Sequence, residues 1–329
     1  MKSLVLTHDG LQIADTPVPA IMPGNVRIEV RSVGISRTDM KIWKGDLEVK
    51  LPLILGHEFT GIVHDSSDPE ICEGSLVTAE TNISCNTCWY CRQNQSHLCN
   101  GRLMLGKTTD GALAEYLTIP ADIVHVLPEG VDTHSGTFTE PLASAIETYA
   151  RTSLQPDEDV LILGTGKAGL LIAQVYDAFG ANVHLLGDNK WHLGLAKQLG
   201  LRNIVNKTEP DWKERIMNST HGVGPRVVVE ATGTAEGINE ALDIVRNGGV
   251  VALTGMSEET TQFDSSAIVK RELTVLGSSK GSYDMALTML GMGRIEVKRL
   301  ITKEFALENG TDAFEYATRP EVVKVKINI

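Results

Sequence analysis

Four cysteines lie close together in the sequence, at Cys85, Cys88, Cys91 and Cys99. Thiolates at such short spacing can surround one tetrahedral zinc ion without ligands from a distant part of the chain. Four thiolates leave no open coordination position, so the predicted site is structural, and its ion stabilises the loop that carries it. His97 offers a substitute ligand. An iron–sulfur cluster or free thiols are the alternatives, but zinc is favoured because a separate redox-cofactor site is predicted below.

The second candidate site is the glycine-rich stretch Gly164-Thr165-Gly166-Lys167-Ala168-Gly169. It follows a short apolar run and precedes a helical pattern, the context in which G-x-G-x-x-G binds a dinucleotide. The first glycine permits the tight turn, the second lets the pyrophosphate approach the backbone, and the third lets helix and strand pack closely. The N–H groups of the helix N-terminus would hold the phosphates. A glycine turn without a ligand is the alternative.

The residues after the next predicted strand bear on the choice between NAD and NADP. In dinucleotide-binding folds an acidic side chain about 20 positions further on binds the ribose 2′-hydroxyl. Asp188 lies near that offset and is followed by Asn189 and Lys190. A carboxylate there would repel a 2′-phosphate, which favours NAD, although Lys190 would partly offset the repulsion. Alternatively, Asp188 only starts a turn.

The remaining patterns indicate which elements position these residues. Short apolar runs at 160–163, 183–186, 227–229 and 250–253 alternate with helical spacing at 170–179, 191–199 and 238–245. This alternation predicts a doubly wound parallel sheet. The first part of the chain is predicted to be β-rich, with strands at 26–30, 113–119 and 123–127. The tail, with helices at 283–292 and 311–317 and a strand at 322–327, is expected to rejoin the first domain.

Bulk composition excludes several classes of protein. The chain has 329 residues, a length that favours two domains. Its net charge of −12 argues against a nucleic-acid partner. No signal peptide and no apolar run of about 18 residues is present, so we expect a cytoplasmic protein without a membrane span. Clustered cysteines in a long chain indicate metal rather than disulfides, and the separate Cys72 is interpreted as a small apolar residue.

The order of these features resembles the zinc-containing medium-chain dehydrogenase/reductase family, which includes alcohol, sorbitol, threonine and glucose dehydrogenases. The resemblance covers essentially the whole chain. It is carried by the stretches 56–63 (GHEFTGIV), 110–116 (DGALAEY) and 140–143 (EPLA), together with the cysteine lobe and the glycine turn. These stretches are specific for the family and less specific for a substrate.

The resemblance implies an α/β fold with two domains. A GroES-like β-rich catalytic domain would span residues 1–148 and carry the zinc lobe at 85–99. A Rossmann NAD(P)-binding domain, a doubly wound parallel sheet, would span 149–281. Residues 282–329 would return to the catalytic domain.

The resemblance also implies the catalytic residues. Ser36 stands where the family normally carries a cysteine ligand of a catalytic zinc. His57 matches the second ligand, and Glu58 matches a residue that binds zinc directly in some members. Glu140 matches the third position, which is cysteine in the alcohol branch and glutamate in the polyol and sugar branch. Thr38 matches a hydroxyl that relays the substrate proton; a turn residue is the alternative.

A serine hydroxyl stays protonated at neutral pH and is a poor zinc ligand. His57, Glu58 and Glu140 would still make a three-ligand site with a fourth position open. An oxygen-rich ligand set would bind zinc more weakly and could admit other divalent ions. The alternative is that His57 and Glu58 persist as a hydrogen-bonded pair without metal.

Two basic residues are assigned to the cofactor by the same resemblance. Arg37 and Lys324 would reach the pyrophosphate, and Asp39 would pair with one of them. Surface charge pairs are the alternative for each.

The favoured function is a zinc-dependent NAD(P) oxidoreductase that transfers hydride between a secondary alcohol, polyol or sugar and the nicotinamide. The metal would act as a Lewis acid on the substrate oxygen, and Glu140 favours a polyol or sugar. The alternatives are a zinc-independent enone or quinone reductase, and a dinucleotide-binding protein that has lost catalysis. The resemblance implies a homodimer or homotetramer joined through the edge of the Rossmann sheet near 273–279.

Overall fold

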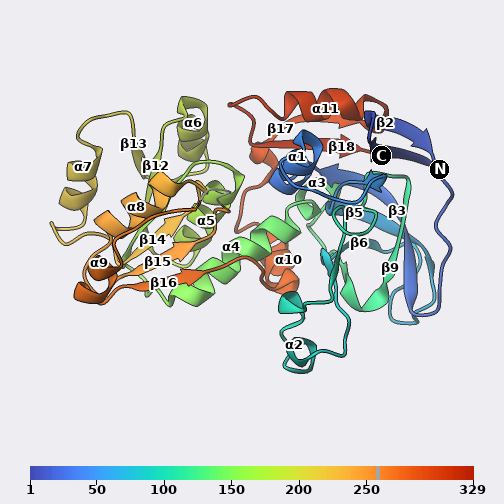
Figure 1. Cartoon of the computed structure of the whole chain (residues 1–329), viewed down its shortest axis with the longest axis horizontal. Helices are drawn as coiled ribbons and strands as arrows, with labels where there is room; N and C mark the ends of the chain where they lie inside the picture. Colours follow the sequence, from blue (N-terminus) through green and yellow to red (C-terminus); the bar gives the residue numbers. More distant parts are fainter. Residues whose placement is uncertain (257–259) are drawn as a thin grey trace. The chain divides into compact units, whose positions relative to one another are not determined.

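The computed structural model describes residues 1–256 and 260–329 and divides the chain into two compact units (Figure 1). The first unit comprises Met1–Glu140, Tyr283–Gly293 and Leu300–Ile329, and the second comprises Pro141–Ser282 and Arg294–Arg299. The sequence predicted divisions after residues 148 and 281. The first division lies instead after Glu140, because one continuous helix, α4 (Thr139–Thr152), begins in the first unit and continues in the second.

The first unit is built on a seven-stranded sheet with the order β10-β6-β5-β3-β18-β17, in which β9 also pairs with β3. Its strands are β3 (Asn25–Gly34), β5 (Glu58–Ser66), β6 (Leu76–Ala79), β9 (Tyr116–Pro120), β10 (Val124–Val126), β17 (Ile301–Ala306) and β18 (Lys324–Asn328). Alternating burial along β3 places Val26, Ile28 and Val30 in the core. Strand β18 pairs antiparallel with β3 and parallel with β17, so the end of the chain completes this sheet, as predicted.

Smaller elements surround this sheet. They are a three-stranded sheet of β1 (Lys2–Thr7), β2 (Gly10–Asp15) and β4 (Leu53–Ile54), a two-stranded sheet of β7 (Asn82–Ile83) and β8 (Leu103–Met104), and the helices α1 (Arg37–Lys44), α2 (Trp89–Arg92), α3 (Thr133–Gly136), α10 (Tyr283–Gly291) and α11 (Gly310–Tyr316). The strand predicted at 113–119 forms only from Tyr116 onward. Residues before it bond elsewhere: the Leu113 N–H donates to the Leu55 carbonyl, and the Leu113 carbonyl accepts from Leu4 N–H.

The second unit confirms the predicted doubly wound parallel sheet. Its order is β13-β12-β11-β14-β15-β16, and every pairing is parallel. The strands are β11 (Asp159–Leu163), β12 (Asn182–Gly187), β13 (Asn203–Asn206), β14 (Val227–Glu230), β15 (Val250–Leu253) and β16 (Thr274–Gly277), and the helices are α5 (Lys167–Ala178), α6 (Lys190–Gln198), α7 (Trp212–Ser219), α8 (Ala235–Ile244) and α9 (Ser265–Lys270).

Helices α7 and α8 share one hydrophobic cluster with the sheet. Trp212 and Ile216 of α7 and Ala241 of α8 are buried together with Val228 and Val251 of the central strands. The two helices therefore lie on the same face of the sheet. Within residues 1–256 and 260–329, none of the helices combines the length and the apolar character needed to cross a bilayer.

His125 on β10 makes a pH-dependent contact inside the first unit. Its Nδ1 lies 2.9 Å from Asp284 Oδ1, its Nε2 lies 3.5 Å from Glu80 Oε1, and its ring stacks on Tyr283. Burial alone would lower the pKa of His125, but the bonds to Glu80 and Asp284 and their negative charges outweigh it and raise the pKa.

A raised histidine pKa stabilises the fold below the pKa of the unfolded chain, near 6.5, and this stabilisation is lost as the pH rises through the folded pKa. We expect His125→Gln to cost about 0.5–1 kcal/mol more at pH 6 than at pH 9, a modest effect because both carboxylates are partly exposed. Urea unfolding of both proteins at the two pH values measures this difference. An equal loss of stability at pH 6 and pH 9 would contradict the contact. Asp284→Asn, which removes one of the two carboxylates, should also cost more stability at pH 6 than at pH 9.

Candidate active site and zinc lobe

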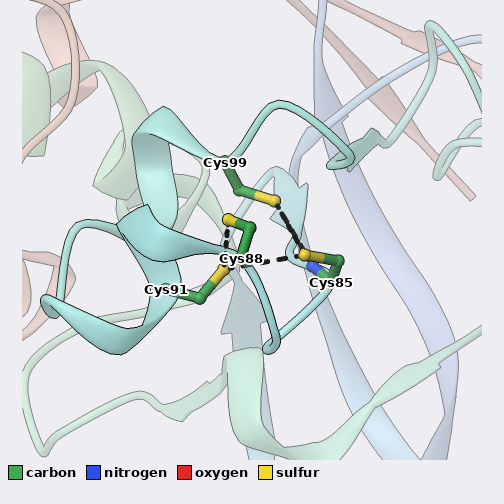
Figure 2. Close-up of side chains that lie close together, drawn as sticks. All are labelled: Cys85, Cys88, Cys91 and Cys99. Atoms are coloured by element: carbon green, nitrogen blue, oxygen red, sulfur yellow. Dashed lines mark hydrogen bonds between the residues drawn. The ribbon is translucent and has the colours of Figure 1, made fainter.

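The four cysteines lie in the segment that connects β7 to β8, and their sulfurs point toward one another (Figure 2). The Sγ–Sγ distances are 3.4 Å for Cys85 and Cys99, 3.5 Å for Cys88 and Cys91, and 4.0 Å for Cys85 and Cys91. Four sulfurs around a zinc ion at about 2.3 Å lie about 3.8 Å apart in a tetrahedron. The lobe therefore has the donor atoms and the size for zinc.

Two of these thiols differ in acidity. The backbone N–H and the hydroxyl of Thr87 lower the pKa of Cys85 to about 5, because both stabilise the thiolate. Burial raises the pKa of Cys91 to about 12. Zinc binds thiolates, so binding the ion here releases a proton from Cys91 and is linked to pH.

Ser36, expected at the position of a cysteine ligand, begins helix α1. Its hydroxyl accepts a hydrogen bond from Asp39 N–H at 3.0 Å, and its own N–H donates to Asp39 Oδ2 at 2.8 Å, which makes a capping box. The other carboxylate oxygen of Asp39 accepts from Gly56 N–H at 3.0 Å and lies 3.7 Å from His57 Nδ1. Asp39 is completely buried. It therefore joins the start of α1 to the loop that carries Gly56 and His57.

Glu58, at the start of β5, forms a buried ion pair with Lys324 at the start of β18. Lys324 Nζ donates to Glu58 Oε2 at 2.6 Å and to the Thr137 carbonyl at 2.7 Å, and it lies 4.1 Å from the centre of the Phe138 ring. The exposed fractions of the two side chains are 0% for Lys324 and 3% for Glu58. Gly34 makes this possible, because a Cβ there would lie 2.0 Å from Lys324 Cε. No local sequence pattern indicates this pair. Contact of Lys324 with a pyrophosphate stays a prediction.

The other predicted catalytic residues lie in the same unit. Thr38, half-buried, and Arg37, exposed, are in the first turn of α1, and Glu140 is the second residue of α4. Within residues 1–256 and 260–329, the four cysteines are the one group of three or more His, Cys, Asp or Glu residues whose ligand atoms all lie within 4.8 Å of one another. Suitable donor atoms for a catalytic zinc are present on His57, Glu58 and Glu140, but these atoms do not all lie within 4.8 Å of one another. No reaction step is therefore assigned to such an ion.

The glycine-rich turn has the shape of a pyrophosphate cradle. Gly164 ends β11 with φ +110°, and Gly166 is the N-cap of α5, without a side-chain hydrogen bond to cap the helix. No atom lies within 4 Å of a Cβ placed on Gly166, whereas a Cβ on Gly169 would lie 1.9 Å from the Gly164 carbonyl oxygen. Open space at the second glycine and close packing at the third are the properties that admit a dinucleotide. The chain's residues fit this cofactor.

Gly169→Ala is expected to weaken NADH binding by about tenfold or more, because its Cβ must push the backbone of the turn away. Gly194→Ala is the control: Gly194 lies in α6, with nothing within 4 Å of its Cβ. That substitution should leave NADH binding unchanged and stabilise the helix by about 0.5–1 kcal/mol. Equal NADH affinities of the Gly169 variant and the wild type, measured by fluorescence titration, would contradict the predicted cradle.

Asp188 and Asn189 follow the end of β12. Asp188 is exposed, and the Asn189 side chain caps α6 by accepting from the N–H groups of Trp191 and His192. Asn189 thus has a structural role, whereas Asp188 remains accessible for the predicted ribose contact.

Glu230, at the end of β14, organises the neighbouring loop and was not among the predicted site residues. It is completely buried, and its Oε1 accepts from the N–H groups of Thr232 and Gly233 at 2.7 and 2.9 Å. Its backbone carbonyl accepts from Gly255 N–H at 3.1 Å, which links the ends of β14 and β15. A glutamate directly after a buried apolar strand was the available sequence signal.

Comparison with known proteins agrees with this architecture. Residues 22–129 match the family described as alcohol dehydrogenase GroES-like domain, and residues 168–292 match the family described as zinc-binding dehydrogenase. A sorbitol dehydrogenase of Halalkalibacterium halodurans is 32% identical, with 99% of this chain and 98% of that protein covered. A D-arabitol-phosphate dehydrogenase of Enterococcus avium is 30% identical, with 97% and 94% covered.

Solved structures show the same fold. A zinc-binding dehydrogenase of Sinorhizobium meliloti 1021, bound to NADP, superposes with a TM-score of 0.93 at 28% identity, over 100% of this chain and 99% of that one. A short chain alcohol dehydrogenase of E. coli CFT073, complexed with NADH, gives a TM-score of 0.93 at 25% identity, over the same shares. The whole-length matches confirm the resemblance found in the sequence. The chain belongs to the zinc-containing medium-chain dehydrogenases, a family of NAD(P)-dependent alcohol and polyol oxidoreductases.

Proposed function

We propose that this dehydrogenase interconverts a secondary hydroxyl of a small polyol, or of a polyol phosphate, and the corresponding ketone. The observation that carries this proposal is Glu140, which stands where the alcohol branch of the family would carry a cysteine. The sorbitol and D-arabitol-phosphate dehydrogenases among its relatives support the same substrate class. A bound NAD(P) supplies the hydride acceptor during oxidation.

The chain's own residues would orient the substrate and remove its hydroxyl proton. Asp39 would fix the backbone next to His57 by accepting a hydrogen bond from Gly56 N–H, and its carboxylate lies 3.7 Å from His57 Nδ1. Thr38 on α1 is the proposed relay: its hydroxyl would accept the substrate proton while passing its own proton on toward solvent. Lys324 pairs with the buried Glu58 carboxylate at 2.6 Å and would hold it in place next to His57 in the chain.

The test is oxidation of a panel of polyols with NAD and with NADP, with ethanol as the comparison alcohol. Turnover of one or more polyols at a higher kcat/KM than ethanol supports the proposal. Turnover of ethanol alone, or of no alcohol in either direction, would overturn it.

A zinc-independent enone or quinone reductase is the second candidate, favoured by Ser36 as a helix cap and by the engagement of Glu58 with Lys324. Metal analysis separates the two: about two zinc ions per chain would indicate a catalytic ion as well as the lobe, and about one would indicate the lobe alone. Ser36→Cys and Ser36→Ala form a matched pair, because both remove the capping hydroxyl and only cysteine adds a thiolate ligand. Higher zinc content and turnover in the cysteine variant alone would support a weakened metal site.

Assembly and location belong to the same proposal. We propose a homodimer or homotetramer in the cytoplasm, joined through β16. In the described part of the chain this strand lies at the edge of the sheet, next to β15, and most of its residues are exposed. Light scattering gives the mass. A Val275→Lys variant on β16, where Val275 is 42% exposed, should shift an oligomer toward monomer.

A further inference from the structure

Three charged side chains form a network at the carboxyl end of the sheet in the second unit. Lys207 directly follows β13, and its Nζ lies 2.8 Å from Glu236 Oε1 and 3.0 Å from Glu240 Oε2. The two glutamates are one turn apart on α8. The side-chain exposures are 29% for Lys207, 16% for Glu240 and 71% for Glu236. Water therefore screens the contact with Glu240 less than an ordinary surface pair, whereas the contact with Glu236 is largely open to water.

The network lies next to the end of β12. The Lys207 N–H donates to the Gly187 carbonyl at 2.8 Å, and Gly187 is the last residue of β12. In dinucleotide-binding folds the adenosine ribose is recognised at the end of this second strand. The exposed Asp188 follows directly. Lys207 is thus a cation at the sheet edge where the 2′-phosphate of NADP would lie.

The charges around this position disfavour a phosphate. Glu236 and Glu240 place two carboxylates on Lys207, and the exposed Asp188, which directly follows β12, adds a third at this edge of the sheet. Burial would lower the pKa of Lys207, but its bonds to Glu236 and Glu240 outweigh burial and raise it, so the amine stays charged and engaged. A lysine without these partners would attract a 2′-phosphate, and a lysine held by two carboxylates does so much less.

We infer that Glu236 and Glu240 are specificity-determining residues, which select NAD over NADP by keeping Lys207 from the 2′-phosphate. The inference rests on the proposed use of the second unit as the dinucleotide site, and it adds a determinant on α8 to the carboxylate of Asp188.

The experiment is fluorescence titration of the full chain with NADH and with NADPH. The wild type should bind NADH more tightly. In Glu236→Gln/Glu240→Gln the affinity for NADPH should rise about tenfold relative to NADH, because the freed ammonium meets the added phosphate. Adding Lys207→Ala to that variant should cancel the gain. Asp243→Asn is the matched control: Asp243 lies on the same helix and pairs with Lys213 at 2.6 Å, so its loss should leave the ratio unchanged.

The outcomes are distinguishable. An unchanged ratio of the two affinities in the double variant, or a wild type that prefers NADPH, would overturn the inference while leaving the dehydrogenase intact. A folded wild type that binds neither nucleotide would instead overturn the dinucleotide site, and with it the proposed function.

Discussion

Cys99→Ser is expected to abolish zinc binding in the lobe and to lower the melting temperature by about 10 °C. Structural zinc contributes about 10–16 kcal/mol of apparent binding energy in small zinc domains, and losing one of four thiolates removes a large part of it. Cys99 is the completely buried member of the set, so the lobe has little room to recruit another ligand. Elemental analysis and calorimetry measure the two effects.

Cys72→Ser is the matched control for this prediction. Cys72 is exposed and lies outside the group of four, so its replacement should change neither zinc content nor melting temperature. A Cys99 variant that keeps its full zinc content would show that His97 or another donor replaces the thiolate. Loss of the zinc without loss of stability would refute the structural role of the lobe.

Lys324→Met is expected to destabilise the first unit by about 3–5 kcal/mol, because it leaves the Glu58 carboxylate buried without its cation. The Thr137 carbonyl, three residues before Glu140, loses the same donor. Urea unfolding gives the size of the loss. Lys2→Met is the comparison, since Lys2 pairs with Glu308 at the surface, where both side chains are more than half exposed. Its replacement should have no measurable effect on stability, because water screens a surface pair.

A double-mutant cycle distinguishes the pair from the volume of the lysine side chain. Adding Glu58→Gln to Lys324→Met removes the uncompensated charge, so the double variant should be more stable than Lys324→Met alone. If the two substitutions change the free energy of unfolding additively, the ion pair is not the cause of the stability loss in Lys324→Met. The readout is stability rather than turnover, because Glu58 belongs to the proposed site.

The fold of the second unit was predictable because its information is local. Each strand is a short apolar run bounded by turn residues, and each helix has a regular apolar spacing, so the predicted helix at 191–199 is found at Lys190–Gln198. The glycine turn was equally readable, since tight turns and close packing require glycine at fixed positions. In the first unit, strand ends depend on distant partners, and the strand predicted at 113–119 is shortened by bonds to residues 4 and 55.

The candidate site was only partly predictable, because its decisive contacts join positions far apart in the sequence. The four cysteines are neighbours in the chain, and their convergence followed from spacing. Glu58 and Lys324 are separated by 266 positions, and no local pattern indicates that they meet. Ser36 was interpreted as a missing ligand, while its hydroxyl also caps α1 by bonding to Asp39. Polar side chains at helix starts can serve both purposes, and the sequence does not distinguish them.

The position of β18 between β3 and β17 has a consequence for biosynthesis. On the ribosome, β3, β5, β6 and β9 emerge early, but residues 32–34 of β3 lack their second partner strand until residues 324–328 have been translated. The Rossmann sheet, whose strands all precede residue 278, can form before then. Nascent chains of that length can therefore carry a folded second unit and an incompletely paired first unit. Chaperones that shield unpaired strands should bind the sheet of the first unit until β18 has been added.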